Sequence, residues 1–254
     1  MTLPRPFLTK PIAHRALHSL AEGAPENSLP AVTRAVHHGY GIEIDLQPSA
    51  DGVAMVFHDA TLDRMTAERG PFRARNADSL RDIQLADCPT HIPTLTEVLA
   101  AVSGAVPILL EIKDQSGCLT GSDGVLETAT IEALTGYDGP VAVMSFNPDM
   151  IAKIAELAPD IPRGLVTAEF EPPYWSFVPR ARAAHLRQFP DLERVGACFL
   201  SHDVQALANP DLAALRARGL PILTWTIRNA AQEAMARPLV DNITFEGYVP
   251  QMAP

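Results

Sequence analysis

Residues 41–59 read GIEIDLQPSADGVAMVFHD, a strand pattern followed by a turn and a second strand pattern. Ile42–Leu46 is apolar apart from Glu43 and Asp45, and such a short run predicts a buried strand. Asp51-Gly52 is a turn signal, and Val53–His58 follows it as a short strand. Because side chains alternate faces along a strand, we expect Glu43 and Asp45 to lie on the same face.

Short apolar runs of this kind alternate with helical patterns along the rest of the chain. The predicted strands are Ile12–Arg15, Ile42–Leu46, Ile108–Ile112, Val141–Ser145, Arg163–Val166, Ala197–Leu200, Ile222–Thr226 and Asn242–Phe245. The predicted helices are Leu29–His38, Leu95–Ser103, Val125–Leu134, Pro148–Leu157, Pro179–Gln188, Pro210–Arg218 and Ala230–Ala236. This alternation predicts an α/β protein with a closed parallel sheet, the TIM (β/α)8 barrel.

Proline placement supports the alternation. Five prolines stand immediately before predicted strands: Pro11, Pro107, Pro140, Pro162 and Pro221. Proline is tolerated at the start of a strand because its missing N–H breaks no ladder bond there. It also stops a preceding helix, so these positions mark the junctions between elements.

The length of 254 residues suits a single barrel domain over residues 1–254, and a hydrophobic content of 47% is enough for a substantial core. One interval, Gln47–Ile92, breaks the alternating rhythm. Long loops in compact domains are usually functional. We therefore interpret this interval as a small insertion after the second strand, placed over the mouth of the barrel.

Composition and charge exclude several kinds of partner. The net charge of −10 disfavours binding to nucleic acid and stable association with anionic membranes. The three cysteines form no CxxC pair, which is typical of free thiols in a cytoplasmic protein. Residues 1–10 lack the apolar segment of a signal peptide, and no run is long enough to span a membrane. The pattern predicts no oligomeric state.

Active sites of barrels form at the carboxyl ends of the strands. The chemically capable residues there are His14, Arg15, Glu43, Asp45, Glu111, Lys113 and Trp225. If the three carboxylates converge, each pair at 4 Å repels by about 4 kcal/mol at an effective dielectric of about 20. The cluster then needs protons or a cation, and Mg²⁺ or Ca²⁺ is the natural ion for oxygen ligands. Alternatively, some of the carboxylates pair with arginine or lysine inside the barrel.

Two histidines flank the predicted carboxylate cluster. His14 ends the first strand, and His58 opens the loop after the strand pattern that precedes it. Cleaving a phosphodiester requires one group that accepts a proton and another that donates one, and imidazoles suit both roles near neutral pH. Arg15 and Lys113 supply the local positive charge that a phosphate needs. We therefore predict a small-molecule phosphodiester as substrate.

The ordered set of motifs resembles the glycerophosphodiester phosphodiesterase family over nearly the whole chain. The matching segments are Ala13-His14-Arg15, Pro25-Glu26-Asn27-Ser28, Glu43-Ile44-Asp45-Leu46, Asp51-Gly52, His58-Asp59, Thr61-Leu62-Asp63-Arg64, Ile92-Pro93-Thr94-Leu95, Glu111-Ile112-Lys113 and Trp225-Thr226. That family is a TIM barrel with a small insertion after the second strand, in agreement with the strand pattern.

The resemblance implies hydrolysis of glycerophosphodiesters to glycerol 3-phosphate and an alcohol, in lipid and glycerol metabolism. It implies that the neighbouring glycerol hydroxyl is the nucleophile, through a cyclic phosphate. It implies one Mg²⁺ or Ca²⁺ on Glu43, Asp45 and Glu111, with His14 and His58 as the acid–base pair. Its other implied site residues are Arg15 and Lys113 on the phosphate, Trp225 at the glycerol end of the pocket, and Glu26 near the metal or the first histidine. Glu26 could equally be an acidic residue at a helix start, and Trp225 a packing residue.

Four departures from the family pattern concern the substrate more than the reaction. Ala16 stands where the family usually has Gly, and the loop from Leu17 to Ala24 is longer than usual. Arg228 precedes Asn229, and the last strand ends in Phe245-Glu246 instead of Asp-x-Pro.

Three other functions compete with this one. They are a phospholipase D-like enzyme similar to sphingomyelinase D, a Schiff-base aldolase using Lys113, and a non-catalytic barrel that binds a phosphate ligand.

Overall fold

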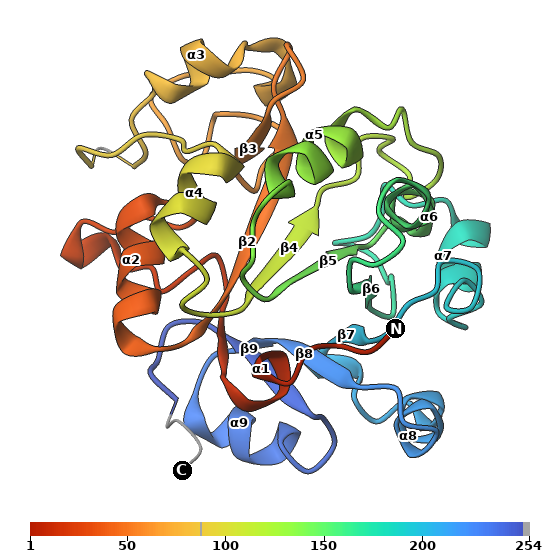
Figure 1. The fold of residues 1–254 in the computed structure, drawn as a ribbon. Helices are drawn as coiled ribbons and strands as arrows, with labels where there is room; N and C mark the ends of the chain where they lie inside the picture. The colour runs from red at the N-terminus through yellow and green to blue at the C-terminus, as the bar shows by residue number, and fades with distance from the viewer. Residues whose placement is uncertain (87, 251–254) are drawn as a thin grey trace. The chain divides into compact units, whose positions relative to one another are not determined.

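The computed structural model describes residues 1–86 and 88–250 of the chain, so Asp87 of the predicted insertion and residues 251–254 lie outside it. These residues form two compact units. Among the described residues, unit 1 comprises residues 1–12, 114–123 and 142–250, and unit 2 comprises residues 13–86, 88–113 and 124–141. Each unit contains strands that alternate with helices along the chain (Figure 1).

Unit 2 is built around one long strand. Strand β2 (Gly41–Pro48) pairs in parallel with β4 (Ile108–Ile112) on one side and antiparallel with β3 (Ala54–Val56) on the other. The whole of β2 is buried, as an inner strand of a parallel sheet requires. The other elements of the unit are η1 (Leu20–Glu22), α2 (Leu29–His38), η2 (Phe72–Ala74), α3 (Ala77–Arg81), α4 (Leu95–Val102) and α5 (Val125–Leu134), and β1 (Ile12–Ala13) leads into it.

Unit 1 contains a run of parallel strands in sequence order. They are β5 (Val141–Ser145), β6 (Arg163–Thr167), β7 (Leu200–Asp203), β8 (Ile222–Ile227) and β9 (Asn242–Phe245). Their helices are α6 (Pro148–Leu157), α7 (Arg180–Leu186), η3 (Val204–Ala206), α8 (Pro210–Ala217) and α9 (Ala230–Ala236), and α1 (Pro6–Thr9) packs beside β9. Sequential parallel strands with helical connections are the βα repeat predicted from the sequence.

The prolines before the strands accept hydrogen bonds from neighbouring strands through their carbonyl groups. Pro107 and Pro140 accept hydrogen bonds from the N–H groups of Ile42 and Ile108, at 2.9 and 3.0 Å. Pro162 and Pro221 do the same in unit 1, accepting from Val143 and Leu200. Each proline therefore extends the pairing of its strand by one acceptor, and its missing N–H costs nothing there.

One predicted strand lies three residues away from its observed position. The apolar run Ala197–Leu200 was the prediction, whereas β7 spans Leu200–Asp203. The strand contains Ser201 and His202, which are both fully buried. A search for apolar runs misses this part of the strand, because its buried residues include polar side chains.

The interval predicted as an insertion has its own small core. Buried side chains from β3 to the start of α4 pack together, namely Met55, Phe57, Leu62, Met65, Phe72, Ala77, Leu80, Ile83, Leu85 and Ile92. The rings of Phe57 and Phe72 stack with their centroids 4.7 Å apart. The described residues of the interval therefore form a packed part of unit 2 (Figure 1).

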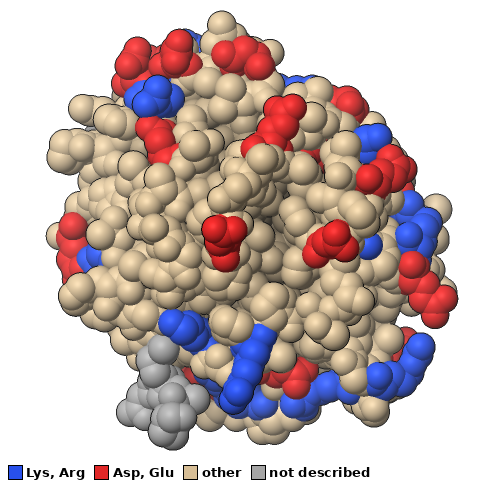
Figure 2. Space-filling view, viewed as in Figure 1, with Lys and Arg blue, Asp and Glu red and all other residues tan. Residues whose placement is uncertain are grey.

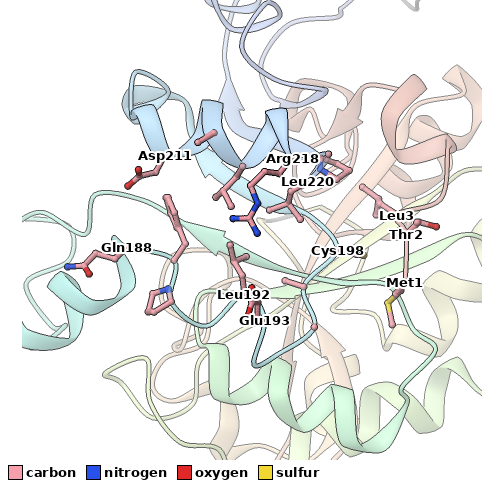
Figure 3. A pocket seen from close by; sticks show the side chains of 18 of the residues that line it. Met1, Thr2, Leu3, Gln188, Leu192, Glu193, Cys198, Asp211, Arg218 and Leu220 are labelled. Atoms are coloured by element: carbon pink, nitrogen blue, oxygen red, sulfur yellow. The ribbon is translucent and has the colours of Figure 1, made fainter.

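A cavity of about 950 Å³ in unit 1 lies at the amino ends of β7 and β8 (Figure 3). The N-terminal residues, the segment before β7 and helix α8 line it, with Arg218, Leu220 and Cys198 among its side chains. Barrel enzymes bind substrates at the opposite ends of the strands. This cavity is therefore no candidate for the active site.

The surface carries charged side chains of both signs (Figure 2). Acidic and basic side chains are interspersed over the face drawn in Figure 2, with broad uncharged areas between them.

Within residues 1–86 and 88–250, every helix is too short or too polar to traverse a lipid bilayer.

Candidate active site

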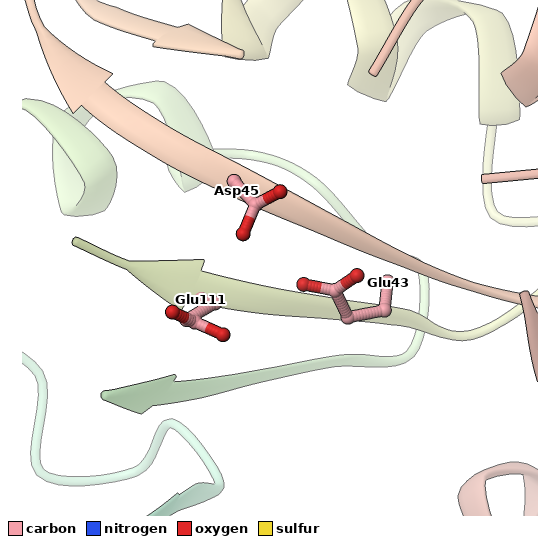
Figure 4. Close-up of side chains that lie close together, drawn as sticks. All are labelled: Glu43, Asp45 and Glu111. Carbon is pink, nitrogen blue, oxygen red and sulfur yellow. The ribbon is translucent and has the colours of Figure 1, made fainter. Parts of the chain in front are cut away.

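Three buried carboxylates meet on the paired parallel strands β2 and β4 in unit 2. Asp45 lies opposite Glu111 in the parallel register, and Glu43 lies two residues before Asp45 on the same face. One oxygen of each carboxylate lies within 4.8 Å of an oxygen of the other two (Figure 4). The structure therefore brings together the three residues predicted as metal ligands.

The electrostatics of this cluster show that its charge is only partly balanced. Burial, together with the charges of Asp45 and Glu111, raises the pKa of Glu43 well above its ordinary value. Burial also raises the pKa of Asp45, but the charges of Lys113, His58, Arg15 and His14 outweigh it and leave that pKa low. Among the described residues, Glu43 Oε1 is buried and has no hydrogen-bond partner.

An unpartnered buried oxygen in an all-oxygen cluster fits a hard divalent cation. Glu43, Asp45 and Glu111 are the residues that would hold such an ion.

Lys113 is close to two of the three carboxylates. Its Nζ lies 2.6 Å from Asp45 Oδ1 and 2.5 Å from Glu111 Oε1. Burial lowers the pKa of Lys113, but these two carboxylates outweigh that effect and raise it, so the ammonium is charged. The alternative that some carboxylates pair with lysine thus holds for Asp45 and Glu111. It does not extend to Glu43 Oε1.

Arg15 contacts the cluster from the turn that follows β1. Its backbone N–H donates to Glu43 Oε2 at 2.8 Å, and its Nε lies 3.6 Å from Asp45 Oδ2. Arg15 and Ala16 both have left-handed backbone, with φ of 53° and 64°. Glycine adopts this conformation most easily, and Ala16 stands where the family usually has Gly.

Asn27 is a site residue that the predicted set missed. Its Nδ2 donates to Asp45 Oδ2 at 2.8 Å, and its Oδ1 accepts from the backbone N–H of Asp45 at 3.1 Å. The side chain is buried, so these bonds hold the carboxylate in one orientation. Its place in the Pro25-Glu26-Asn27-Ser28 motif was the available signal, but a polar residue before a helix is ordinarily a cap.

Both predicted catalytic histidines lie close enough to Asp45 for their charges to lower its pKa. His14 follows β1 directly, and His58 follows β3 by two residues. His58 Nδ1 lies 2.6 Å from Asp59 Oδ1. An ionised carboxylate only accepts, so this contact puts the imidazole proton on Nδ1 and leaves Nε2 as the basic nitrogen.

The backbone of His58 is also held in place. Gln47 Nε2 donates to its carbonyl at 3.2 Å, and the N–H of Phe57 donates to the carbonyl of Asp45 at 2.9 Å.

Glu26 contacts arginines and not the carboxylate cluster. Its Oε1 accepts from Arg15 at 2.8 Å and from Arg64 at 2.7 Å. Glu26 therefore belongs to the surroundings of Arg15, one of the predicted phosphate ligands. The helix start at α2 is capped instead by Ser28, whose Oγ accepts from the N–H of Ala31.

Trp225 belongs to unit 1, where it lies in β8 opposite Asp203 of β7. Its Nε1 donates to the carbonyl of Ser201 at 3.1 Å, and its ring meets that of Phe146 edge to face. It lines a cavity of about 610 Å³ that the loop after β6 also lines. Both the packing and the binding interpretation of Trp225 thus have structural support.

Comparison with known proteins assigns the chain to a family. Residues 14–244 match the sequence profile of the glycerophosphoryl diester phosphodiesterase family. A glycerophosphodiester phosphodiesterase from Caldanaerobacter subterraneus is 28% identical over 91% of this chain and 91% of its own length. Glycerophosphodiester phosphodiesterase 1 from Bos taurus is 27% identical over 85% of this chain and 71% of its own. The chain belongs to the glycerophosphoryl diester phosphodiesterase family, and it is a phosphoric diester hydrolase.

Solved structures agree with this assignment at the level of fold. An Oleispira antarctica phosphodiesterase, in complex with the product sn-glycerol-3-phosphate, matches with a TM-score of 0.78 at 24% identity, over 94% of this chain and 93% of that chain. A glycerophosphodiester phosphodiesterase from Parabacteroides distasonis matches with a TM-score of 0.73 at 23% identity, over 93% and 92%. The predicted fold class, the TIM (β/α)8 barrel, is confirmed.

Proposed function

We propose that this protein hydrolyses glycerophosphodiesters to glycerol 3-phosphate and an alcohol, with one divalent cation, Mg²⁺ or Ca²⁺, and with His14 and His58 as acid and base. The observation that supports this most is the buried trio Glu43, Asp45 and Glu111, whose oxygens lie within 4.8 Å of one another beside both imidazoles. Bound there, the ion would polarise a phosphoryl oxygen and offset negative charge.

The chain's own residues would transfer the protons and bind the substrate. One imidazole takes the proton of the attacking hydroxyl, and the other gives a proton to the departing alkoxide. The bond from His58 Nδ1 to Asp59 keeps its Nε2 available for this transfer. Arg15 and Lys113 bring positive charge to the phosphate. Asn27 keeps Asp45 in place during the reaction.

The test is an activity screen on glycerophosphodiesters with different head groups, with Mg²⁺, with Ca²⁺ and with excess EDTA. We expect glycerol 3-phosphate to appear only when a metal is present. His14→Ala and His58→Ala should each lower the rate by about 10²- to 10⁴-fold. Full turnover in EDTA, or variants as active as the wild type, would refute the mechanism.

Three further assays distinguish the alternative functions. Activity on lipid vesicles but not on soluble diesters would indicate the phospholipase D-like alternative. Tight binding of glycerol 3-phosphate without hydrolysis would indicate a binding protein. Borohydride trapping of a carbonyl substrate on Lys113 would indicate an aldolase. Location in the cytoplasm stays a prediction of the sequence.

A further inference from the structure

Arg64, in the segment between β3 and η2, donates hydrogen bonds to two carboxylates. Its Nε and Nη2 donate to the two oxygens of Asp59, at 2.6 and 3.0 Å. Its Nη1 and Nη2 donate to the two oxygens of Glu26, at 3.0 and 2.7 Å. Both contacts are bidentate, which is the arrangement that the planar guanidinium fork favours.

Each of these two carboxylates also holds a residue of the proposed site. Asp59 Oδ1 lies 2.6 Å from His58 Nδ1, and Glu26 Oε1 accepts from Arg15 at 2.8 Å. The contacts form an unbroken series from His58 through Asp59, Arg64 and Glu26 to Arg15. Arg64 is the one member that joins its two halves.

Arg64 also neutralises a local repulsion. Its Nη2 is bonded to both Asp59 and Glu26, so the two carboxylates lie on either side of a single nitrogen. Partial burial raises the pKa of Asp59, but hydrogen bonds from His58 and Arg64 outweigh it and lower that pKa below its usual range. Both carboxylates are therefore anionic at neutral pH, and removing Arg64 would leave them to repel each other.

We propose that Arg64 is a positioning residue for the reaction, which orients the imidazole of His58 through Asp59 and the guanidinium of Arg15 through Glu26. The inference rests on the proposed function, since it concerns the residues that would carry the reaction out. In these contacts Arg64 binds Asp59 and Glu26 and not the carboxylate trio. It acts on His58 and Arg15 through Asp59 and Glu26.

The first experiment compares Arg64→Ala with wild type in steady-state kinetics on the best glycerophosphodiester of the screen, with metal present. We expect kcat to fall by about 10- to 100-fold, with a smaller change in KM, because a misoriented imidazole slows proton transfer. Arg81→Ala is the matched control, since Arg81 forms an ion pair with Glu97 in the same unit and has nearly equal exposure, 47% against 46%. This control should keep wild-type kinetics.

Two further measurements separate orientation from a general effect on folding. Guanidinium chloride at low millimolar concentration should restore part of kcat in Arg64→Ala, because the side chain is half exposed and a small planar cation can reach the space it leaves. Arg64→Lys should remain impaired, since an ammonium cannot bind both carboxylates bidentately. Arg64→Lys also keeps the test possible if the alanine variant fails to fold.

A mutant cycle with the pair Asp59→Asn and Glu26→Gln tests the route of the effect, because both carboxylates bind Arg64. If Arg64 acts through these two residues, adding Arg64→Ala to the pair should leave the protein about as slow as the pair alone. Rate losses that multiply would overturn the inference, and so would Arg64→Ala with wild-type kcat. Neither result would affect the proposed function, which is tested separately by the turnover of glycerophosphodiesters by wild type and the histidine variants, with and without metal.

Discussion

His202 is a buried titratable residue that makes the stability of this protein depend on pH. It lies in β7, is fully buried, and has its Nδ1 2.7 Å from Thr167 Oγ1. Burial lowers its pKa to about 4, so the imidazole is neutral in the folded protein at neutral pH. An unfolded chain has no such burial, and its histidine titrates near 6.5.

The sign of the pH effect follows from this difference. Between about pH 6.5 and 4 the unfolded state binds a proton that the folded state does not, so the free energy of unfolding falls as the pH falls. The contribution of His202 is at most about 3 kcal/mol. In urea unfolding at several pH values, the free energy of unfolding should depend less on pH for His202→Asn than for wild type. The contributions of the other titratable groups are shared by both proteins and cancel in this comparison. Parallel curves would contradict the prediction.

The segment from β3 to α4 shows how a whole element supports the proposed site. Phe57 stacks on Phe72 in its core, and Phe57 immediately precedes His58. Hydrogen bonds from Phe57 and Gln47 place His58 next to the end of β2. The position of the imidazole thus depends on apolar packing within the element as well as on polar contacts.

Phe72→Ala tests this dependence. Removing a buried aromatic side chain costs about 3–5 kcal/mol, and the loss should be concentrated in this element. We expect faster hydrogen exchange over residues 53–85 and a loss of kcat, while exchange in unit 1 changes little. Leu157→Ala, at an exposed position in α6, is the control. Unchanged exchange around His58 would show that the packing does not hold it.

Over the whole molecule, the buried acidic trio couples stability to the proposed ion. A chain of net charge −10 that buries three neighbouring carboxylates should gain stability from any cation bound only when it is folded. At one hundred times its dissociation constant, such an ion stabilises a protein by about 2.7 kcal/mol.

Thermal unfolding with and without Mg²⁺ or Ca²⁺ measures this coupling. We expect the metal to raise the melting temperature of wild type and to have little effect on Glu111→Gln, which removes one predicted ligand. Glu156→Gln, at an exposed position in α6, should respond like wild type. A metal-induced shift of equal size in all three proteins would point to general ion effects and against the proposed site.

The sequence was sufficient to predict the fold class and most of the element boundaries. Strands β4, β5 and β9 and helices α2, α5, α6 and α9 coincide with their predicted ranges. These elements carry clear periodic patterns, and the N-cap residues Ser28 and Asn229 mark where two of the helices begin. Glu43 and Asp45 were likewise predictable as a pair on one face, because alternation along a strand is a local property.

Tertiary structure alone decided what those residues contact. The register of β2 against β4 places Asp45 opposite Glu111, and the fold brings Asn27 to Asp45 and Arg64 to both Asp59 and Glu26. Asn27 is 18 residues from Asp45 and Arg64 is 38 residues from Glu26, so no local pattern specifies these partners. Periodicity records which face of an element is buried, whereas the identity of a buried polar partner depends on how distant elements pack together.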